Sequence, residues 1–226
     1  MSTVTRGNKG ELLVKKEIAK IKEYHKIINN FTFVNNKTNS SHQIDHILIH
    51  PHGVFVIETK NYYGTIVSDT DDVFWLKIIK GQKTIISNPI NQNKSHQLLV
   101  GRLLNKQYDV VSVIVFVKNN APYVGDYNVI NLKDLLLLID THPYQKLLTD
   151  DEINSVYKTL KSVNTKITLK EHLESIDKIK ARKAAQREDM EYAIENRLCP
   201  RCGQKLEVKG FVYKCPHCKY GFDISK

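Results

Sequence analysis

Two acidic side chains stand inside an apolar segment, residues 43–60, that is predicted to form a buried β-hairpin. We expect the turn to pair His50 with Gly53. This register places Asp45 directly opposite Glu58 on the neighbouring strand. Like charges paired across strands are destabilising, and burying them costs more free energy. The pair therefore predicts a positive partner, and a divalent cation bound by carboxylate oxygens is the simplest one.

Lys60 lies two residues beyond Glu58, so it shares the same face of the strand and supplies a second positive charge. Glu58 and Lys60 could alternatively form a plain ion pair along the strand, but this interpretation leaves Asp45 unexplained. Alternation places His46 and His50 on the opposite face, so we do not expect a histidine metal site to compete with the carboxylates.

The four cysteines of the 226-residue chain all lie in its last thirty residues. They form two Cys-x-x-Cys pairs that are twelve residues apart, and these are Cys199 with Cys202 and Cys215 with Cys218. Such pairs in a cytoplasmic chain indicate a tetrahedral Zn²⁺ site rather than disulfides, with redox-active or buried thiols as the alternative. The sequence therefore predicts a structural zinc ion.

The composition favours an anionic partner. The net charge is +10 and the pI is about 9.3, which is typical of proteins that bind nucleic acid but also occurs elsewhere. No run of eighteen apolar residues is present, and the N-terminus lacks the apolar stretch of a secretory signal. We therefore expect a cytoplasmic protein that has no membrane partner.

Periodicity and turn residues predict the order of elements. We expect helices over 8–29, 88–106, 135–139 (capped by Asn131) and 150–163 (after a capping signal at Thr149–Glu152), and strands over 31–34, 43–50, 53–60, 65–67, 73–79, 84–86, 110–117 and 129–130. A further helix over 169–197 is charged on all sides in its middle, as helices that bridge two domains are. The predicted domains are 1–165, a helical linker over 166–197, and a zinc module over 198–226.

Residues 166–226, the linker and the zinc module together, have a net charge of +5, with 14 Lys and Arg against 9 Asp and Glu. Aromatic residues alternate with lysines between and after the cysteine pairs; these are Phe211, Tyr213, Tyr220 and Phe222, with Lys209, Lys214 and Lys219. Rings beside cations suit single-stranded nucleic acid. Alternatively, the rings fill the small core of the module. Trp75, Tyr62 and Tyr63 are expected to serve in packing.

The order of these motifs resembles the PD-(D/E)xK nuclease superfamily, and within it the nuclease-related domain, NERD, over residues 7–120. The matching segments are Gly7–Glu11 at the start of the first helix, Gln43–His46, Val56–Tyr62, and Asn88–Gln92 at the start of the next helix. The C-terminal module resembles the four-cysteine zinc ribbons of bacterial topoisomerases, which are familiar partners of NERD domains. The resemblance implies a restriction-endonuclease-like α/β fold, an α+β mixed sheet flanked by helices.

The resemblance also implies roles for individual residues. Asp45 and Glu58, with the carbonyl of Thr59, are the expected ligands of Mg²⁺ or Mn²⁺, and Lys60 is expected to orient water or stabilise the transition state. Glu11 corresponds to an acid on the first helix, for which the alternative is a first-turn acid favoured by the helix dipole. Gln92 corresponds to a glutamine near the active site. Gln92 and His96 could equally be ordinary residues of a helix surface.

The expected function is a metal-dependent deoxyribonuclease, a phosphodiester hydrolase whose zinc ribbon helps to bind DNA, including single-stranded DNA. The alternatives are a nucleic-acid-binding protein that retains the nuclease fold without catalysis, and a protein-interaction adaptor. Many nucleases of this fold cut both strands as dimers, so a homodimer stays open. A helicase or another DNA-processing protein is also compatible as a partner.

Overall fold

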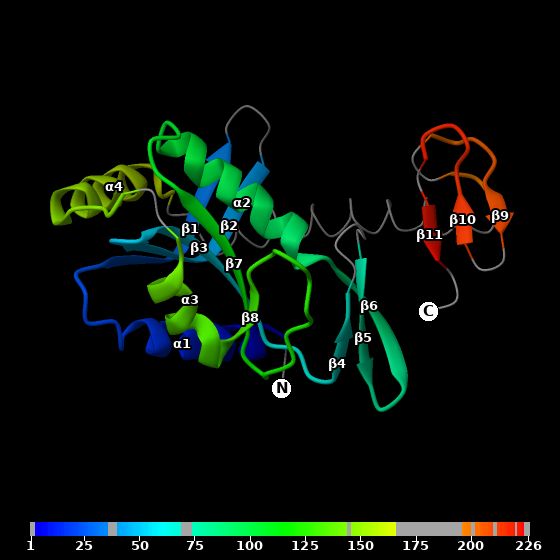
Figure 1. Ribbon diagram of the computed structural model, residues 1–226, viewed down its shortest axis with the longest axis horizontal. Helices are drawn as coiled ribbons and strands as arrows, with labels where there is room; N and C mark the ends of the chain where they lie inside the picture. The colour runs from blue at the N-terminus through cyan, green and yellow to red at the C-terminus, as the bar shows by residue number, and fades with distance from the viewer. Residues whose placement is uncertain are drawn as a thin grey trace. The chain divides into compact units, whose positions relative to one another are not determined.

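Figure 1 shows the computed structural model of the chain, which describes residues 3–35, 40–68, 74–143, 146–165, 196–199, 202–209, 212–219 and 221–223. The chain divides into two compact units, Met1–Lys166 and Ile167–Lys226, which are considered separately below. The linker predicted for 166–197 lies outside the described residues except at positions 196 and 197.

The first unit alternates helices and strands along the chain. Its elements are α1 Thr3–Ile18, β1 Lys26–Asn35, β2 Ser40–His50, β3 Gly53–Lys60, β4 Thr65–Val67, β5 Phe74–Ile79, β6 Gln82–Ser87, α2 Pro89–Leu103, β7 Val110–Phe116, β8 Val129–Asn131, the short 3₁₀ helix η1 Leu132–Asp134, α3 Leu135–Thr141 and α4 Asp150–Val163. No helix in the described part of the chain is both long and apolar enough to cross a membrane.

The centre of this unit is a five-stranded sheet in the order β1-β2-β3-β7-β8. Neighbours among β1, β2 and β3 are antiparallel, whereas β3, β7 and β8 run parallel, so the sheet is mixed. Helices cover it from both sides (Figure 1): α1 and α3 belong to the core on one face, and α2 and α4 to the core on the other. The predicted α+β architecture with a mixed, helix-flanked sheet is confirmed.

Strand β3 is buried on both faces, which explains its nearly continuous apolar sequence. Val54 and Val56 pack into the core under α2 and α4, while Phe55 and Ile57 pack into the core under α1 and α3. The same alternation carries Glu58 to the α2 side of the sheet, where the apolar residues end. The hydrophobic strand thus fixes the position of the first acid beyond it.

The predicted hairpin of β2 and β3 is confirmed, with His50 paired with Gly53. The helix predicted over 8–29 is wrong at both ends, because α1 covers Thr3–Ile18 and residues 26–29 belong to β1. Ile27 and Ile28 pair with β2 instead, since β-branched residues pack well on a sheet.

Two expected helix caps have different outcomes. Thr149 forms a capping box with Glu152 at the start of α4, in agreement with the sequence. Asn131 makes no side-chain cap, because its Oδ1 accepts a hydrogen bond from the N–H of Ala121 at 3.0 Å. A contact with a distant loop thus replaces the local cap.

Strands β4, β5 and β6 form a separate three-stranded antiparallel sheet. Its hairpin turns at Lys80 and Gly81, which both have positive φ, 49° and 80°, as two-residue hairpin loops require. Trp75 is buried and belongs to a core with Phe116 and Ile90, so its predicted role in packing is confirmed. This sheet therefore connects β3 to α2 and packs against the central sheet through Trp75.

The second unit contains three short antiparallel strands, β9 Glu207–Lys209, β10 Val212–Lys214 and β11 Gly221–Asp223, in the order β11-β10-β9. Its core consists of Cys199, Cys215 and Leu206, with Tyr213 packed against them. This small core needs another source of stability.

Candidate functional site

Asp45 lies at an interruption of the pairing in β2. The pairing of β2 with β3 ends at His46 and Ile57, so the predicted pairing of Asp45 directly opposite Glu58 does not form. On the other side, the pairing with β1 skips Asn30, which has a positive φ of 51°. The Oδ2 atom of Asp45 instead accepts a hydrogen bond of 2.8 Å from the backbone N–H of Thr59. The carboxylate thus accepts a hydrogen bond from a backbone N–H of β3 where strand pairing has ended. This hydrogen bond holds Asp45 beside the end of β3.

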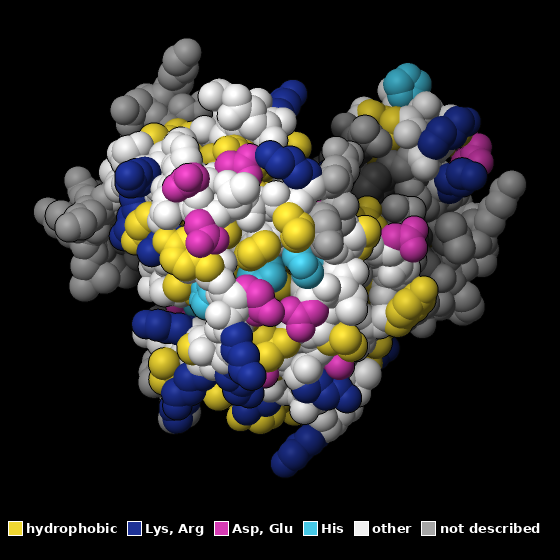
Figure 2. Space-filling model, turned by 60° about the vertical axis from the view of Figure 1, so that its left-hand side comes forward, with side chains coloured by type: hydrophobic (Ala, Val, Ile, Leu, Met, Phe, Trp, Pro, Cys, Tyr) yellow, Lys and Arg dark blue, Asp and Glu magenta, His cyan; other side chains and the backbone are white. Residues whose placement is uncertain are grey.

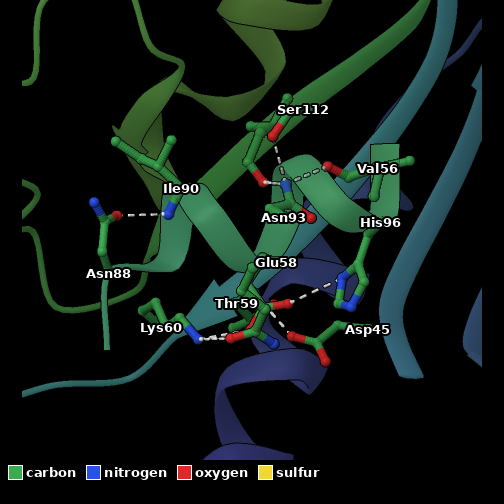
Figure 3. A network of polar contacts seen from close by, with 12 residues as sticks. Asp45, Val56, Glu58, Thr59, Lys60, Asn88, Ile90, Asn93, His96 and Ser112 are labelled. Carbon is green, nitrogen blue, oxygen red and sulfur yellow. Dashed lines mark hydrogen bonds and ion pairs between the residues drawn. The ribbon is translucent and has the colours of Figure 1, made fainter. Parts of the chain in front are cut away.

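Glu58 and Lys60 form an ion pair along β3. The Nζ atom of Lys60 lies 2.6 Å from Oε1 of Glu58, and both side chains are largely buried. Gln92 on α2 is exposed, and its Oε1 lies 3.5 Å from the same Nζ. Figure 3 shows Lys60 on one side of Glu58, with Asp45 on the other. The ion pair is therefore present, but a second acid lies next to it.

Glu11 reaches the site from α1. The alternative that it is a first-turn acid is wrong, because α1 begins at Thr3 and has no acid in its first turn. Gly10 allows the close approach, since a Cβ there would lie 3.1 Å from side-chain atoms of both Thr59 and Asn61. Burial and the charge of Glu58 raise the pKa of Glu11. Three acids from three elements, α1, β2 and β3, therefore share one electrostatic environment.

The acids exceed the positive charge available to them. Burial and the charge of Glu58 raise the pKa of Asp45 from 3.8 to about 8, although the Thr59 N–H and Lys60 act in the opposite direction. Burial alone would lower the pKa of Lys60, but the neighbouring Glu58 raises it, so Lys60 is a cation. A single lysine does not neutralise the group.

One oxygen of Glu58 lacks a hydrogen-bond partner. Glu58 is only 4% exposed, and its Oε2 is buried without a hydrogen bond, while Oε1 is bound by Lys60. A buried carboxylate oxygen without a partner is costly. A divalent cation with oxygen ligands would satisfy it and would also offset the charge of Asp45, so these residues fit such an ion.

His96, which the sequence left open as a residue of the helix surface, is buried at 5% exposure. Its Nδ1 lies 3.8 Å from Oε2 of Glu58. Asn93 and Val100 are also buried, and their spacing from His96 of three and four residues marks one face of α2. That spacing in the sequence could have identified His96 as inward-facing. Gln92 lies outside this buried face.

The four cysteines come together in the second unit. Each offers one sulfur, and these atoms all lie within 4.8 Å of one another, close enough to bind a metal ion such as zinc. The N–H of Cys218 points at Sγ of Cys215 at 3.5 Å. Among the described residues, this is the one group of three or more His, Cys, Asp or Glu that reaches such proximity, so Glu11, Asp45 and Glu58 lie further apart.

The aromatic residues of the zinc module are described in part. Tyr213 packs against the cysteine core, as the alternative of ring packing predicts, and Lys214 and Lys219 are exposed. Phe211 and Tyr220 lie outside the described residues, as do the side chains of Lys209 and Phe222.

A concavity lies elsewhere in the first unit. It has a volume of about 270 Å³ and contains none of the predicted site residues. Its polar lining comes from Gln97, Asp109, Ser112, Asp126, Asn128 and His142. On the face shown in Figure 2, Lys and Arg side chains are interspersed with Asp and Glu. The positive net charge therefore does not form a single continuous basic surface on this face.

Comparison with known proteins assigns the first unit to a family. Residues 6–117 match the family model of the nuclease-related domain, NERD. An uncharacterized protein of Bacillus anthracis is 32% identical over 166 residues, covering 70% of this chain and 77% of that protein. The chain belongs to the NERD family. No solved structure gives a significant match.

The NERD match contains all five residues predicted for the catalytic site, which are Glu11, Asp45, Glu58, Lys60 and Gln92. It runs from α1 to the end of β7, so it covers the three central strands that position the acids. The four cysteines lie outside it. The nuclease-related region and the four-cysteine module are thus separate parts of the sequence.

The closeness of α1 to β3 is a testable feature of the NERD domain. Substituting alanine for Gly10 would place a methyl group 3.1 Å from side-chain atoms of Thr59 and Asn61, which is tighter than ordinary contact, so these side chains or α1 must shift. We expect a loss of about 1–3 kcal/mol in the free energy of unfolding, measured with urea. Gly101→Ala in α2 is the matched control, because its new methyl group meets nothing within 4 Å. Equal effects of the two substitutions would contradict this account.

Asp45 also predicts a pH dependence of stability in metal-free protein. The folded state keeps the proton of Asp45 up to about pH 8, whereas an ordinary aspartate loses it near 3.8. The stability that Asp45 contributes is therefore complete below pH 3.8 and is lost as the pH rises toward 8. Asp45→Asn cannot ionise, so its free energy of unfolding relative to wild type should increase over this range.

The measurement is urea unfolding of both proteins in EDTA between pH 4 and 8. This range runs from the ordinary pKa of aspartate, 3.8, to the raised pKa of Asp45, about 8. The comparison cancels other titrations, including those of His46 and His50, in which burial lowers the pKa to about 4. Excess Mn²⁺ should reduce the difference in free energy of unfolding by which wild type is less stable than Asp45→Asn at pH 8. A pH-independent difference between the two proteins would contradict the assignment.

Proposed function

We propose that the NERD domain is a metal-dependent deoxyribonuclease of the PD-(D/E)xK type that hydrolyses phosphodiester bonds. The observation that carries this proposal is half-buried Asp45 beside buried Glu58, whose Oε2 has no hydrogen-bond partner and whose Oε1 forms an ion pair with a lysine of the same strand. A structural ion pair needs one acid and one base. A second, half-buried acid with a raised pKa is a cost that cation binding explains.

In this proposal, Asp45, Glu58 and the carbonyl of Thr59 hold Mg²⁺ or Mn²⁺. The ion, when bound, supplies Lewis-acid chemistry that withdraws negative charge from the scissile phosphate and makes water more acidic. The Thr59 N–H holds Asp45 in place through the 2.8 Å hydrogen bond to Oδ2. The other oxygen of Asp45 is thereby left for the ion. Glu11 adds negative charge from α1 and raises the affinity of the site for a cation.

Lys60 acts on the phosphate in this proposal. The ion pair with Oε1 of Glu58 keeps its ammonium group charged and fixes the position of Nζ. A fixed positive charge at this place stabilises the negative charge that develops on the phosphate oxygens and can orient the attacking water. Gln92, 3.5 Å from the same Nζ, positions Lys60 or a water molecule at the exposed side of the site.

The second unit serves as a DNA-binding zinc ribbon, similar to those of bacterial topoisomerases. Four cysteine sulfurs within 4.8 Å of one another suit a structural Zn²⁺ ion. Lys214 and Lys219 are exposed and available to phosphates, while Tyr213 packs in the core. Zinc binding would use the cysteines and DNA contact the lysines, so the ribbon can bind both at once. Its role in this proposal is to bind DNA, while the NERD domain hydrolyses it.

Incubation of the purified full chain with supercoiled plasmid and with single-stranded DNA tests this function. We expect cleavage in Mg²⁺ or Mn²⁺ and none in EDTA, because the acids cannot approach a phosphate without a cation between them. The same assay with RNA of matched sequence shows whether the protein prefers DNA or RNA. Cleavage that persists both in EDTA and in Asp45→Ala would reject the proposed mechanism. Absence of cleavage on every substrate would favour a nucleic-acid-binding protein without catalysis.

A further inference from the structure

A histidine faces the acids from the side opposite to Lys60. Figure 3 shows His96 projecting from α2 toward Glu58, on the same side as Asp45. The ring is 5% exposed, and its Nδ1 lies 3.8 Å from Oε2 of Glu58. Both atoms are buried without a hydrogen-bond partner. At this distance they do not form a hydrogen bond with each other.

Two buried polar atoms that face each other without bonding are costly unless a third group lies between them. A neutral imidazole carries its proton on one ring nitrogen and a lone pair on the other. With the ring proton on Nε2, that lone pair is on Nδ1 and points at a carboxylate oxygen. Two facing acceptors repel an anion and attract a hydrogen-bond donor or a cation, and a divalent cation is the partner that also offsets the charge of Glu58.

The separation of the two atoms fits a shared ion. Bonds from a transition metal to imidazole nitrogen and to carboxylate oxygen are each about 2.0–2.2 Å long. Their sum exceeds the 3.8 Å between Nδ1 of His96 and Oε2 of Glu58, so one ion can contact both atoms at a bent angle. The distance between the two atoms is thus compatible with a shared ion.

The fold holds the imidazole in this orientation. Asn93, one turn earlier in α2, donates hydrogen bonds from Nδ2 to the carbonyls of Val56 and Val113, which fixes α2 to the sheet. The ring of His42 packs edge-on against the ring of His96, with centroids 5.8 Å apart. A rigid imidazole is a better ligand than a mobile one because less entropy is lost on binding.

We propose that His96 is a nitrogen ligand of the divalent cation held by Glu58 and that it makes this site prefer Mn²⁺ to Mg²⁺. The inference rests on the metal site of the proposed function and adds a residue and a metal preference to it. Mg²⁺ is bound almost entirely by oxygen, whereas imidazole suits the first-row transition metals. His42 is a positioning residue that orients the ligand.

Pulsed electron paramagnetic resonance of Mn²⁺ tests the ligand directly, because a coordinated imidazole nitrogen gives a ¹⁴N coupling. The sample is the full chain with zinc in its cysteine site and one equivalent of Mn²⁺. We expect the ¹⁴N coupling in wild type and in His42→Asn, and its loss in His96→Asn. Calorimetry should show that His96→Asn lowers the ratio of Mn²⁺ to Mg²⁺ affinity at least about 10-fold.

The spectrum of wild type decides the matter even if His96→Asn does not fold. Absence of ¹⁴N coupling in wild type, or failure to bind Mn²⁺, would overturn the inference. Coupling that persists in His96→Asn but disappears in His42→Asn would show that His42 is the ligand, and this would also overturn the inference. DNA cleavage without nitrogen coupling rejects only this inference, whereas nitrogen coupling without cleavage rejects only the nuclease function.

Discussion

Asp45→Asn is expected to reduce metal-dependent DNA cleavage by about 10²- to 10³-fold or more, with little change in the fold. The amide keeps an oxygen that can accept the hydrogen bond from the Thr59 N–H, so the local structure of β2 and β3 is retained. It removes the negative charge that attracts the cation. Because the substitution also removes repulsion with Glu58 and Glu11, the metal-free variant should be at least as stable as wild type near pH 8.

The measurement is the initial rate of plasmid cleavage in Mn²⁺ and in Mg²⁺, together with the urea midpoint in EDTA. Asp126→Asn is the matched control, since Asp126 is exposed and lies in the loop before β8, outside the candidate site. The control should cleave at the wild-type rate. Wild-type cleavage by Asp45→Asn would remove this carboxylate from the mechanism, and an unfolded variant would point to a structural role.

Replacement of Cys199 and Cys202 by serine is expected to remove one zinc ion per chain and to unfold the second unit. The described core of this unit is four cysteines with Leu206 and Tyr213, which is too small to be stable alone. Structural zinc contributes on the order of 10 kcal/mol of binding free energy, and this is folding free energy when no site exists in the unfolded chain.

Metal analysis measures the loss of zinc, and the amide NMR signals of β9, β10 and β11 report whether the second unit is unfolded. The unfolding transition of the NERD domain should stay at its wild-type midpoint, because none of its described core residues belongs to the second unit. His217→Asn, between Cys215 and Cys218, is the control: His217 is exposed, and the variant should keep its zinc. One zinc per chain in the double cysteine variant would contradict the assignment.

Features with a local cause could be predicted from the sequence. The tight turn after His50 and the period-two alternation were enough to predict the register of β2 and β3, and with it the nearness of Asp45 and Glu58. The spacing within each Cys-x-x-Cys pair predicted the sulfur cluster, because this spacing is typical of two sulfurs that bind one zinc ion. Thr149 and Glu152 likewise form their capping box within one helical turn.

Features that depend on packing between distant segments could not be predicted in this way. Ile28 fits a helical pattern, but pairing with Ile47 places it in β1, and Asn131 binds the backbone of Ala121 instead of capping a helix. His96 became a candidate ligand only because Asn93 anchors α2 against β3 and β7. Residue periodicity indicates which side of a helix or strand is buried. It does not indicate which residues pack against that side, because these come from elements far apart in the chain.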